Sequence, residues 1–133
     1  MILIGVIAEH TLAQQHSLTI VIRNVQTDMG SIMIGIYNES QSFPKEGRAY
    51  KDIRIKPELP VTRFQIELPE GVYAICLCHD VNNDRKCNTD LLGRPKEPFG
   101  FSNNLKPKFS APGFTETSFS LKCNREVSIT LID

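Results

Sequence analysis

The sequence lacks the features that mark two large classes of protein. Its 133 residues contain no tryptophan, and 15 Lys plus Arg balance 15 Asp plus Glu, so the formal net charge is zero. Nucleic-acid-binding proteins need a basic excess to release counterions from phosphates, and polybasic membrane-surface proteins need it too. No apolar run approaches the ~20 residues of a membrane span. We therefore expect neither a nucleic-acid partner nor a membrane-spanning segment.

Motifs of nucleophilic and phosphate chemistry are also missing. The sequence has no Gly-x-Ser-x-Gly elbow and no glycine-rich phosphate loop. Its histidines are His10, His16 and His79. One histidine beyond residue 16 excludes a multi-histidine zinc site there and leaves little choice for a Ser-His-Asp set. We expect the protein not to be an enzyme and assign no catalytic residues.

The first 16 residues are open to two interpretations. Met1 to Ala8 is apolar, like the central region of a signal peptide, and Ala13 offers a small residue before a cut. However, no basic residue precedes the run and Glu9 interrupts it, which also fits a first strand or a disordered tail. We expect residues 1–16 to be a signal peptide or tail and residues 17–133 to form one domain. A cleaved leader would place the protein in the periplasm or outside the cell.

Alternating apolar residues dominate the rest of the chain, and no helical period is sustained. Such alternation, interrupted by turn residues, is typical of half-buried β-strands. The predicted strands span residues 18–25, 31–37, 49–56, 61–68, 72–79, 115–121 and 126–132. The first two and the last two are each expected to form a hairpin. About seven short strands predict an all-β antiparallel sandwich, with a small closed barrel as the alternative.

One long segment, residues 80–114, has no obvious strand. Unstructured loops longer than ~12–15 residues are uncommon and are usually functional or disordered. This segment carries too much apolar area to remain in water, in Leu91, Leu92, Phe99, Phe101, Phe109 and Phe114. We predict an ordered loop packed over one end of the sandwich. Its own apolar core or a bound ion must offset the entropy of ordering it.

The start of this loop resembles a calcium-binding turn. Asp80, Asn82 and Asp84 alternate as in an EF-hand-type loop, which supplies hard oxygen ligands. The full predicted metal set is Asp80, Asn82, Asp84, Lys86 through its carbonyl, Asn88 and Asp90. Two positions depart from the pattern, since Arg85 replaces the sixth-position glycine and Leu91 the twelfth-position glutamate. Simple Asx turns after a strand are the alternative.

Further along the loop, a mixed polar and aromatic patch is a candidate binding surface. It comprises Glu97, Phe99, Phe101, Asn103 and Asn104, and we group His79 with it. Exposed aromatic rings beside amides suit carbohydrate or peptide ligands. Alternatively, the phenylalanines form the core of the loop, the asparagines cap turns, and His79 hydrogen-bonds the following loop.

The four cysteines leave several states open. They are Cys76, Cys78, Cys87 and Cys123, and four cysteines allow three pairings. Cys76 and Cys78 share a strand face and are poorly placed to bridge each other. Either could pair with Cys87 or Cys123 in an exported protein. Free or buried thiols are one alternative, and a zinc site from three or four thiolates is another, although the spacing matches no zinc ribbon.

Two sequence patterns resemble known families. The junction from Leu68 to Tyr73 resembles the Leu-Pro-x-Gly-x-Tyr hairpin of prealbumin-like and carboxypeptidase-regulatory-like sandwiches, which implies that Tyr73 packs near the turn. The run His79-Asp80-x-Asn82-x-Asp84, followed by Leu92-Gly93-x-Pro95-x-Glu97 and Phe99-Gly100-Phe101-Ser102-Asn103-Asn104, resembles the DUF2141 family. That resemblance covers residues 18–131. It implies a secreted or periplasmic bacterial β-sandwich, immunoglobulin-like or prealbumin-like, of unknown function.

Together these patterns predict an exported binding module. We expect the loop to present a surface to an envelope protein or glycan, with calcium as a structural ion. A small metal-dependent enzyme using His79, Asp80 and Glu97 is the alternative. Convergence of these three side chains in an open cleft would favour the enzyme, whereas a buried His79 would favour the structural ion.

Overall fold

The computed structural model describes residues 14–86, 97–107 and 110–133, which contain eight β-strands and two short helices. The strands are β1 (Gln15–Arg23), β2 (Ser31–Tyr37), β3 (Lys51–Ile55), β4 (Val61–Pro69), β5 (Gly71–Asp80), β6 (Phe99–Phe101), β7 (Phe119–Leu121) and β8 (Arg125–Thr130). The helices are the 3-10 helix η1 (Ser102–Asn104) and α2 (Phe114–Thr117). The first strand thus begins slightly before the expected domain start at residue 17. The expected signal peptide lies almost entirely outside the described residues.

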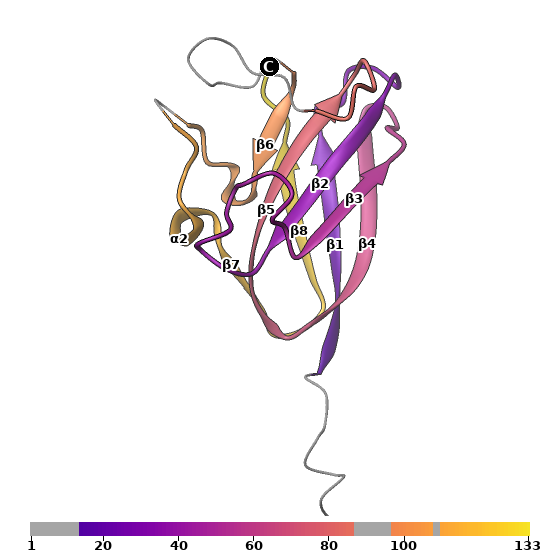
Figure 1. Cartoon of the computed structure of the whole chain (residues 1–133). Helices are drawn as coiled ribbons and strands as arrows, with labels where there is room; N and C mark the ends of the chain where they lie inside the picture. The colour runs from indigo at the N-terminus through magenta and orange to yellow at the C-terminus, as the bar shows by residue number, and fades with distance from the viewer. Residues whose placement is uncertain (1–13, 87–96, 108–109) are drawn as a thin grey trace, which may run out of the picture.

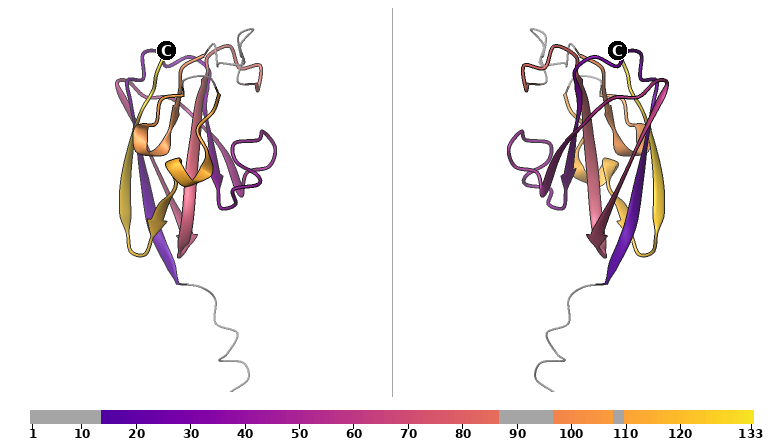
Figure 2. Two further views of the ribbon diagram at one scale, coloured as in Figure 1. Left: turned by 90° about the vertical axis from the view of Figure 1, so that its left-hand side faces the viewer. Right: turned by 90° about the vertical axis from the view of Figure 1, so that its right-hand side faces the viewer.

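The strands form a two-layer sandwich, seen from the side in Figure 2. The three-stranded sheet has the order β4-β1-β8, and the five-stranded sheet has the order β3-β2-β5-β6 with β7 also on β5. All neighbours are antiparallel except β1 and β8, which run parallel. The predicted all-β sandwich is therefore confirmed, and the sheets do not close into a barrel.

The alternating apolar residues of the strands form the core, as the sequence predicts. One face of β1 and one face of β2 are completely buried between the sheets, through Leu18, Ile20, Ile22, Ile32, Ile34 and Ile36. Burying each such side chain contributes roughly 1.5–3 kcal/mol. Tyr73 joins this core at 3 % exposure, and its hydroxyl donates to the Pro69 carbonyl at 2.5 Å, as expected at the turn.

Both predicted hairpins are wrong. β1 pairs with β4 and β8, whereas β2 pairs with β3 and β5, so the 24–30 connection crosses between the sheets. In the same way β7 pairs with β5 and β8 with β1. Alternation specifies which face of a strand is buried, but two inward faces can meet across a core as well as along one sheet.

The predicted strand over residues 115–121 is also wrong in its first half. Residues 114–117 form α2, and only residues 119–121 form a strand. The Glu116 side chain accepts a hydrogen bond from the Gly113 amide at 2.9 Å, which satisfies a donor at the helix start.

A second apolar cluster covers the outer face of the five-stranded sheet. Tyr37, Phe43, Ala74, Phe99 and Phe101 form it, with edge-to-face contacts between the aromatic rings. The segment after residue 96 therefore packs on a sheet face, not over one end, and it contains β6, which the sequence analysis missed. Figure 1 shows β6 beside β5, with α2 below it.

Gly100, in the middle of β6, explains why this strand escaped detection. A β-carbon there would lie 2.9 Å from Cγ2 of Ile129 and 3.2 Å from the Thr130 carbonyl oxygen. Only glycine allows β6 to approach β8 so closely, although glycine ordinarily argues against a strand.

None of the helices in the described part of the chain has the length and hydrophobicity needed to span a bilayer.

Candidate functional site

The candidate site forms where β5 ends and the chain turns, at the upper end of the sandwich in Figure 1. Gly30 packs directly against this turn: at φ +71°, a β-carbon on it would lie 2.0 Å from the Asp80 carbonyl oxygen. His79 is 1 % exposed, and its Nε2 lies 2.7 Å from the Met29 carbonyl oxygen. Because a carbonyl only accepts, Nε2 carries the proton of this bond. The 24–30 connection thus fixes the end of β5.

Three carboxylates meet at this turn. One oxygen from each of Asp80, Asp84 and Glu97 lies within 4.8 Å of the other two. Asp80 ends β5 and Asp84 lies in the turn that follows, whereas Glu97 comes from the segment that precedes β6. We call these three residues the acidic trio. Glu97 is held against the turn by the Val81 amide, which donates to its Oε2 at 2.8 Å.

Asp80 is the buried centre of the site. Its side chain is 0 % exposed, and its Oδ2 accepts hydrogen bonds from Arg54 Nη2 at 2.7 Å and the Arg85 amide at 2.8 Å. Its Oδ1 accepts from the Asp84 amide at 3.2 Å. Burial would raise the pKa of Asp80, but the hydrogen bonds from Arg54, Arg85 and Asp84 outweigh it and lower this pKa below its usual value. Asp80 is therefore ionised at neutral pH.

The turn itself is built from local side-chain bonds. Asn82 Oδ1 accepts from the Asp84 amide at 3.3 Å, and Asp84 Oδ1 accepts from the Lys86 amide at 2.9 Å. Asn83 and Arg85 have positive φ values of 60° and 67°. The Asx turns considered as an alternative to calcium are therefore present, and they coexist with the acidic trio. The sixth loop position adopts the left-handed backbone that favours glycine, although Arg85 occupies it.

The structure describes four of the six predicted metal residues, namely Asp80, Asn82, Asp84 and Lys86; Asn88 and Asp90 lie outside the described residues. Glu97, predicted as a binding residue, joins the carboxylates instead. Sequence reasoning missed Arg54, which reaches Asp80 from the edge strand β3. Only the strand order β3-β2-β5 could have revealed this contact. Close carboxylate oxygens suit a hard divalent cation such as calcium.

The remaining residues of the predicted binding patch support the fold. Phe99 and Phe101 are 8 % and 5 % exposed in the outer cluster. Asn103 Nδ2 donates to the carbonyls of Glu116 and Ser118, both at 3.0 Å. These contacts match the alternative of a loop core with capped turns, and ligand binding by the patch stays a prediction.

Asn104 performs a related task at the edge of β8. Its Oδ1 accepts from the Thr130 amide at 2.9 Å, and its Nδ2 donates to the Ser128 carbonyl at 3.3 Å. The side chain thereby substitutes for a neighbouring strand along this edge.

The described cysteines differ in state. Cys78 is disulfide-bonded, whereas Cys76 and Cys123 carry free thiols. Burial, together with the nearby Asp52 and Glu46 carboxylates, raises the pKa of the Cys76 thiol to about 12. Within the described residues, no group of three cysteines and histidines lies close enough to bind a metal.

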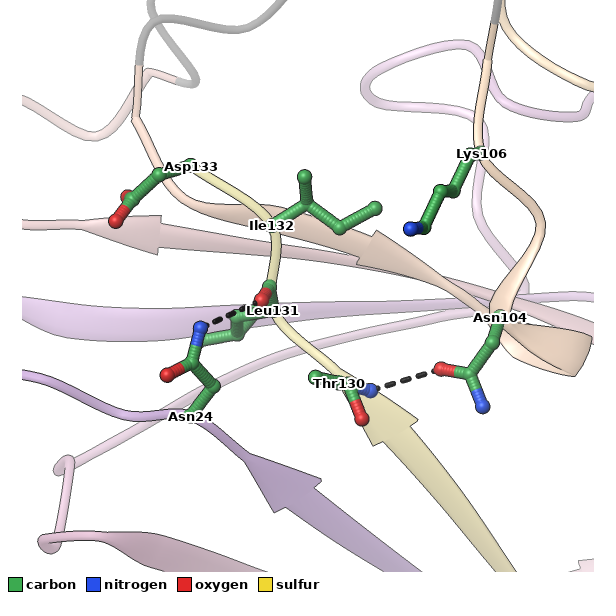
Figure 3. A pocket seen from close by; sticks show the side chains of 7 residues that line it. All are labelled: Asn24, Asn104, Lys106, Thr130, Leu131, Ile132 and Asp133. Carbon is green, nitrogen blue, oxygen red and sulfur yellow. Dashed lines mark hydrogen bonds between the residues drawn. The ribbon is translucent and has the colours of Figure 1, made fainter.

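A pocket of about 470 Å³ lies beside the end of β8 (Figure 3). It is lined by Asn24, Asn104, Lys106, Thr130, Leu131, Ile132 and Asp133. Asn24 Nδ2 donates to the Leu131 carbonyl at 2.9 Å, so this amide, like that of Asn104, is engaged within the fold. Of the predicted binding and metal residues that the structure describes, Asn104 is the one that lines this pocket.

Comparison with known proteins places the chain in a family. No curated protein and no solved structure matches it. A family model described as an uncharacterized protein conserved in bacteria (DUF2141) matches residues 20–130, most of the chain. The protein therefore belongs to the DUF2141 family.

Proposed function

We propose that this protein is an exported binding module whose loop end is stabilised by calcium. The observation that carries the proposal is the acidic trio, in which Asp80, Asp84 and Glu97 bring carboxylate oxygens within 4.8 Å of one another. Like charges this close repel, and a divalent cation bound between them converts the repulsion into attraction.

Calcium would join two segments that are separate in the sequence. Asp80 is the last residue of β5, Asp84 lies in the turn after it, and Glu97 lies two residues before β6. Leu91 stands where an EF-hand-type loop has its last carboxylate, and Glu97 supplies a carboxylate from further along. Asn82 and the Lys86 carbonyl are the other oxygen donors that the sequence predicts in the described turn. The ion would thereby fix the entry to β6 and to the outer apolar cluster.

The surface around this end supports a role in binding. Met29 is 61 % exposed beside the end of β5, and Leu59 is 53 % exposed in the 56–60 connection. The Val25 amide donates to the Pro60 carbonyl at 3.1 Å, so these two connections adjoin. Large apolar side chains exposed on adjoining connections favour contact with a partner, here an envelope protein or a glycan.

Export is supported by the disulfide of Cys78, because disulfides persist in oxidising compartments such as the periplasm. The buried ring of His79, engaged with the Met29 carbonyl, favours a structural ion over a catalytic histidine.

Thermal unfolding of the whole chain in calcium and in chelator tests the proposal. A ligand that binds only the folded state adds ~2.7 kcal/mol at one hundred times its Kd, so calcium should raise the midpoint clearly. Glu97→Gln and Asp84→Asn should abolish the rise, because both remove a carboxylate and keep the side-chain size. Glu126→Gln, at an exposed carboxylate on β8, is the matched control and should keep the rise. Equal midpoints in calcium and chelator for the wild-type protein would overturn the ion.

A further inference from the structure

β4 leaves one edge of the three-stranded sheet open. It lies at the end of the order β4-β1-β8, on the right in Figure 1. Among the described residues, no strand pairs with its outer side. The strand is nine residues long, which is long for an unprotected edge.

The direction of the backbone groups on this edge follows from the ladder with β1. The register pairs Gln15 with Pro69, and the Glu70 amide donates to the Gln14 carbonyl at 2.7 Å. Hydrogen-bonded pairs alternate along an antiparallel ladder, so the even-numbered residues of β4 bond to β1. The odd-numbered residues therefore direct their backbone groups to the open edge. Pro69 has no N–H group, but because it is odd-numbered its nitrogen faces the open edge, and no hydrogen bond between β1 and β4 is lost.

Charge along this edge is arranged symmetrically. Arg63 and Glu67 are exposed on the solvent face and flank Gln65 at equal spacing. All three direct their N–H and C=O groups to the open edge. Arg63 makes one weak exposed contact within the chain, 4.0 Å from Glu126, and the Ser17 hydroxyl donates to Glu67.

We propose that two copies of the protein pair through β4, antiparallel and centred on Gln65, to form a two-fold homodimer. In this register each Arg63 lies opposite Glu67 of the second copy, and Gln65 lies opposite Gln65. The two Arg63–Glu67 pairs and the central Gln65 pair are hydrogen-bonded pairs, because these odd-numbered residues direct their backbone groups outward from each copy. The two three-stranded sheets become one six-stranded sheet, and the contact is self-complementary, as two-fold symmetry requires.

The charges favour this register over those centred on Arg63 or on Glu67. Centring the pair on Arg63 would place two arginines opposite each other, and centring it on Glu67 would place two glutamates opposite each other. On the core side, the half-buried Phe64 and Ile66 would face each other across the new ladder and cover apolar surface left at the edge.

Sedimentation velocity of the full chain over a concentration series tests the dimer. The wild-type protein should shift from monomer to dimer as its concentration rises. Arg63→Glu and Glu67→Arg each turn two attractive cross-strand pairs into repulsive ones and should raise the Kd roughly ten-fold or more. The double variant Arg63→Glu/Glu67→Arg restores opposite charges and should return the Kd to near the wild-type value.

Two further variants separate this contact from general effects. Lys122→Glu makes the same charge change as Arg63→Glu at an exposed residue outside β4 and should leave the Kd unchanged. Gln65→Pro removes an outward N–H and spares the backbone bonds to β1, although it deletes the exposed hydrogen bond from Gln65 Nε2 to the Ser17 hydroxyl. It should therefore abolish the dimer with only a small loss of thermal stability.

Charged side chains on an edge strand can also prevent pairing between copies. If the wild-type protein is a monomer at every concentration, that explanation holds and the proposal is overturned. A dimer unaffected by Gln65→Pro and by the single charge reversals would overturn it too, because the contact would then lie elsewhere.

Discussion

Removing the arginine that reaches the buried carboxylate should destabilise the fold by a measurable amount. Arg54→Met deletes the charge and the 2.7 Å hydrogen bond to Asp80 while keeping most of the side-chain length. Asp80 would remain completely buried, with the backbone amides of Asp84 and Arg85 as its donors. The variant therefore isolates what the guanidinium contributes.

The size of the effect lies between two limits. Removing one partner of a fully buried ion pair costs ~3–5 kcal/mol, and a hydrogen bond to a charged group contributes ~1.5–3 kcal/mol. Arg54 is 27 % exposed and Asp80 keeps two backbone donors, so the lower range applies. We expect a loss of about 2 kcal/mol, measured by urea unfolding, and a fall in Tm of roughly 8 °C for a domain of this size.

The loss should depend on pH in a defined direction. Because the folded pKa of Asp80 is lowered, its stabilisation is present above the unfolded pKa of about 4 and is lost as the pH falls through the folded pKa. In Arg54→Met the burial of Asp80 has less to oppose it, so this pKa rises. The difference in unfolding free energy between wild type and variant should be largest near neutral pH and narrow below about pH 4.

Arg48→Met is the matched control, because Arg48 is exposed. Its substitution should cost less than ~0.5 kcal/mol at any pH. Equal losses for the two variants, or a loss in Arg54→Met that does not change with pH, would refute the role assigned to the Arg54–Asp80 pair.

Three shorter predictions concern the same region and its neighbouring strand. Gly30→Ala should cost more than about 2 kcal/mol in urea unfolding, because its β-carbon would lie 2.0 Å from the Asp80 carbonyl oxygen; a near-neutral result would contradict this packing. Arg85→Gly should stabilise the protein by up to ~1 kcal/mol by relieving the φ of 67°, whereas Arg85→Ala should not, and equal unfolding midpoints for the two variants would disprove strain at this position. Alkylation of the folded protein at about pH 8 should label Cys123 and spare the half-buried Cys76, whose pKa is raised to about 12; mass spectrometry showing equal labelling would refute the raised pKa of that thiol.

The sequence predicts the buried faces of the strands better than their partners. The alternation of Ile32, Ile34 and Ile36 specifies the inner face of β2, and the structure confirms it. The same alternation does not tell whether β1 and β2 pair in one sheet or face each other from opposite sheets, because the same side chains are buried in either case. β6 was missed because three residues around Gly100 carry no periodic signal, and its pairing with β5 spans more than twenty residues.

The same distinction applies to the acidic trio. Asp80, Asn82 and Asp84 are neighbours in the sequence, and their spacing alone predicts the turn that the structure contains. Glu97 and Arg54 reach Asp80 through the pairing of β5 with β6 and the order β3-β2-β5. No local sequence pattern encodes such contacts. The sequence therefore predicts where the candidate site lies, but not that Glu97 and Arg54 contribute to it.

The contacts of Asp80 also separate the fold from the proposed ion. Asp80 is fixed by Arg54 and by two backbone amides within the protein itself, so its place does not depend on a cation. Asp84 is exposed at the rim of the turn, and Glu97 belongs to another segment. A cation would therefore act chiefly by joining Glu97 to the turn, and its effect on stability should be lost in Glu97→Gln while the Arg54–Asp80 pair stays intact. Substitution of Asp80 itself would disturb both the fold and the ion, which makes it the less informative test of calcium.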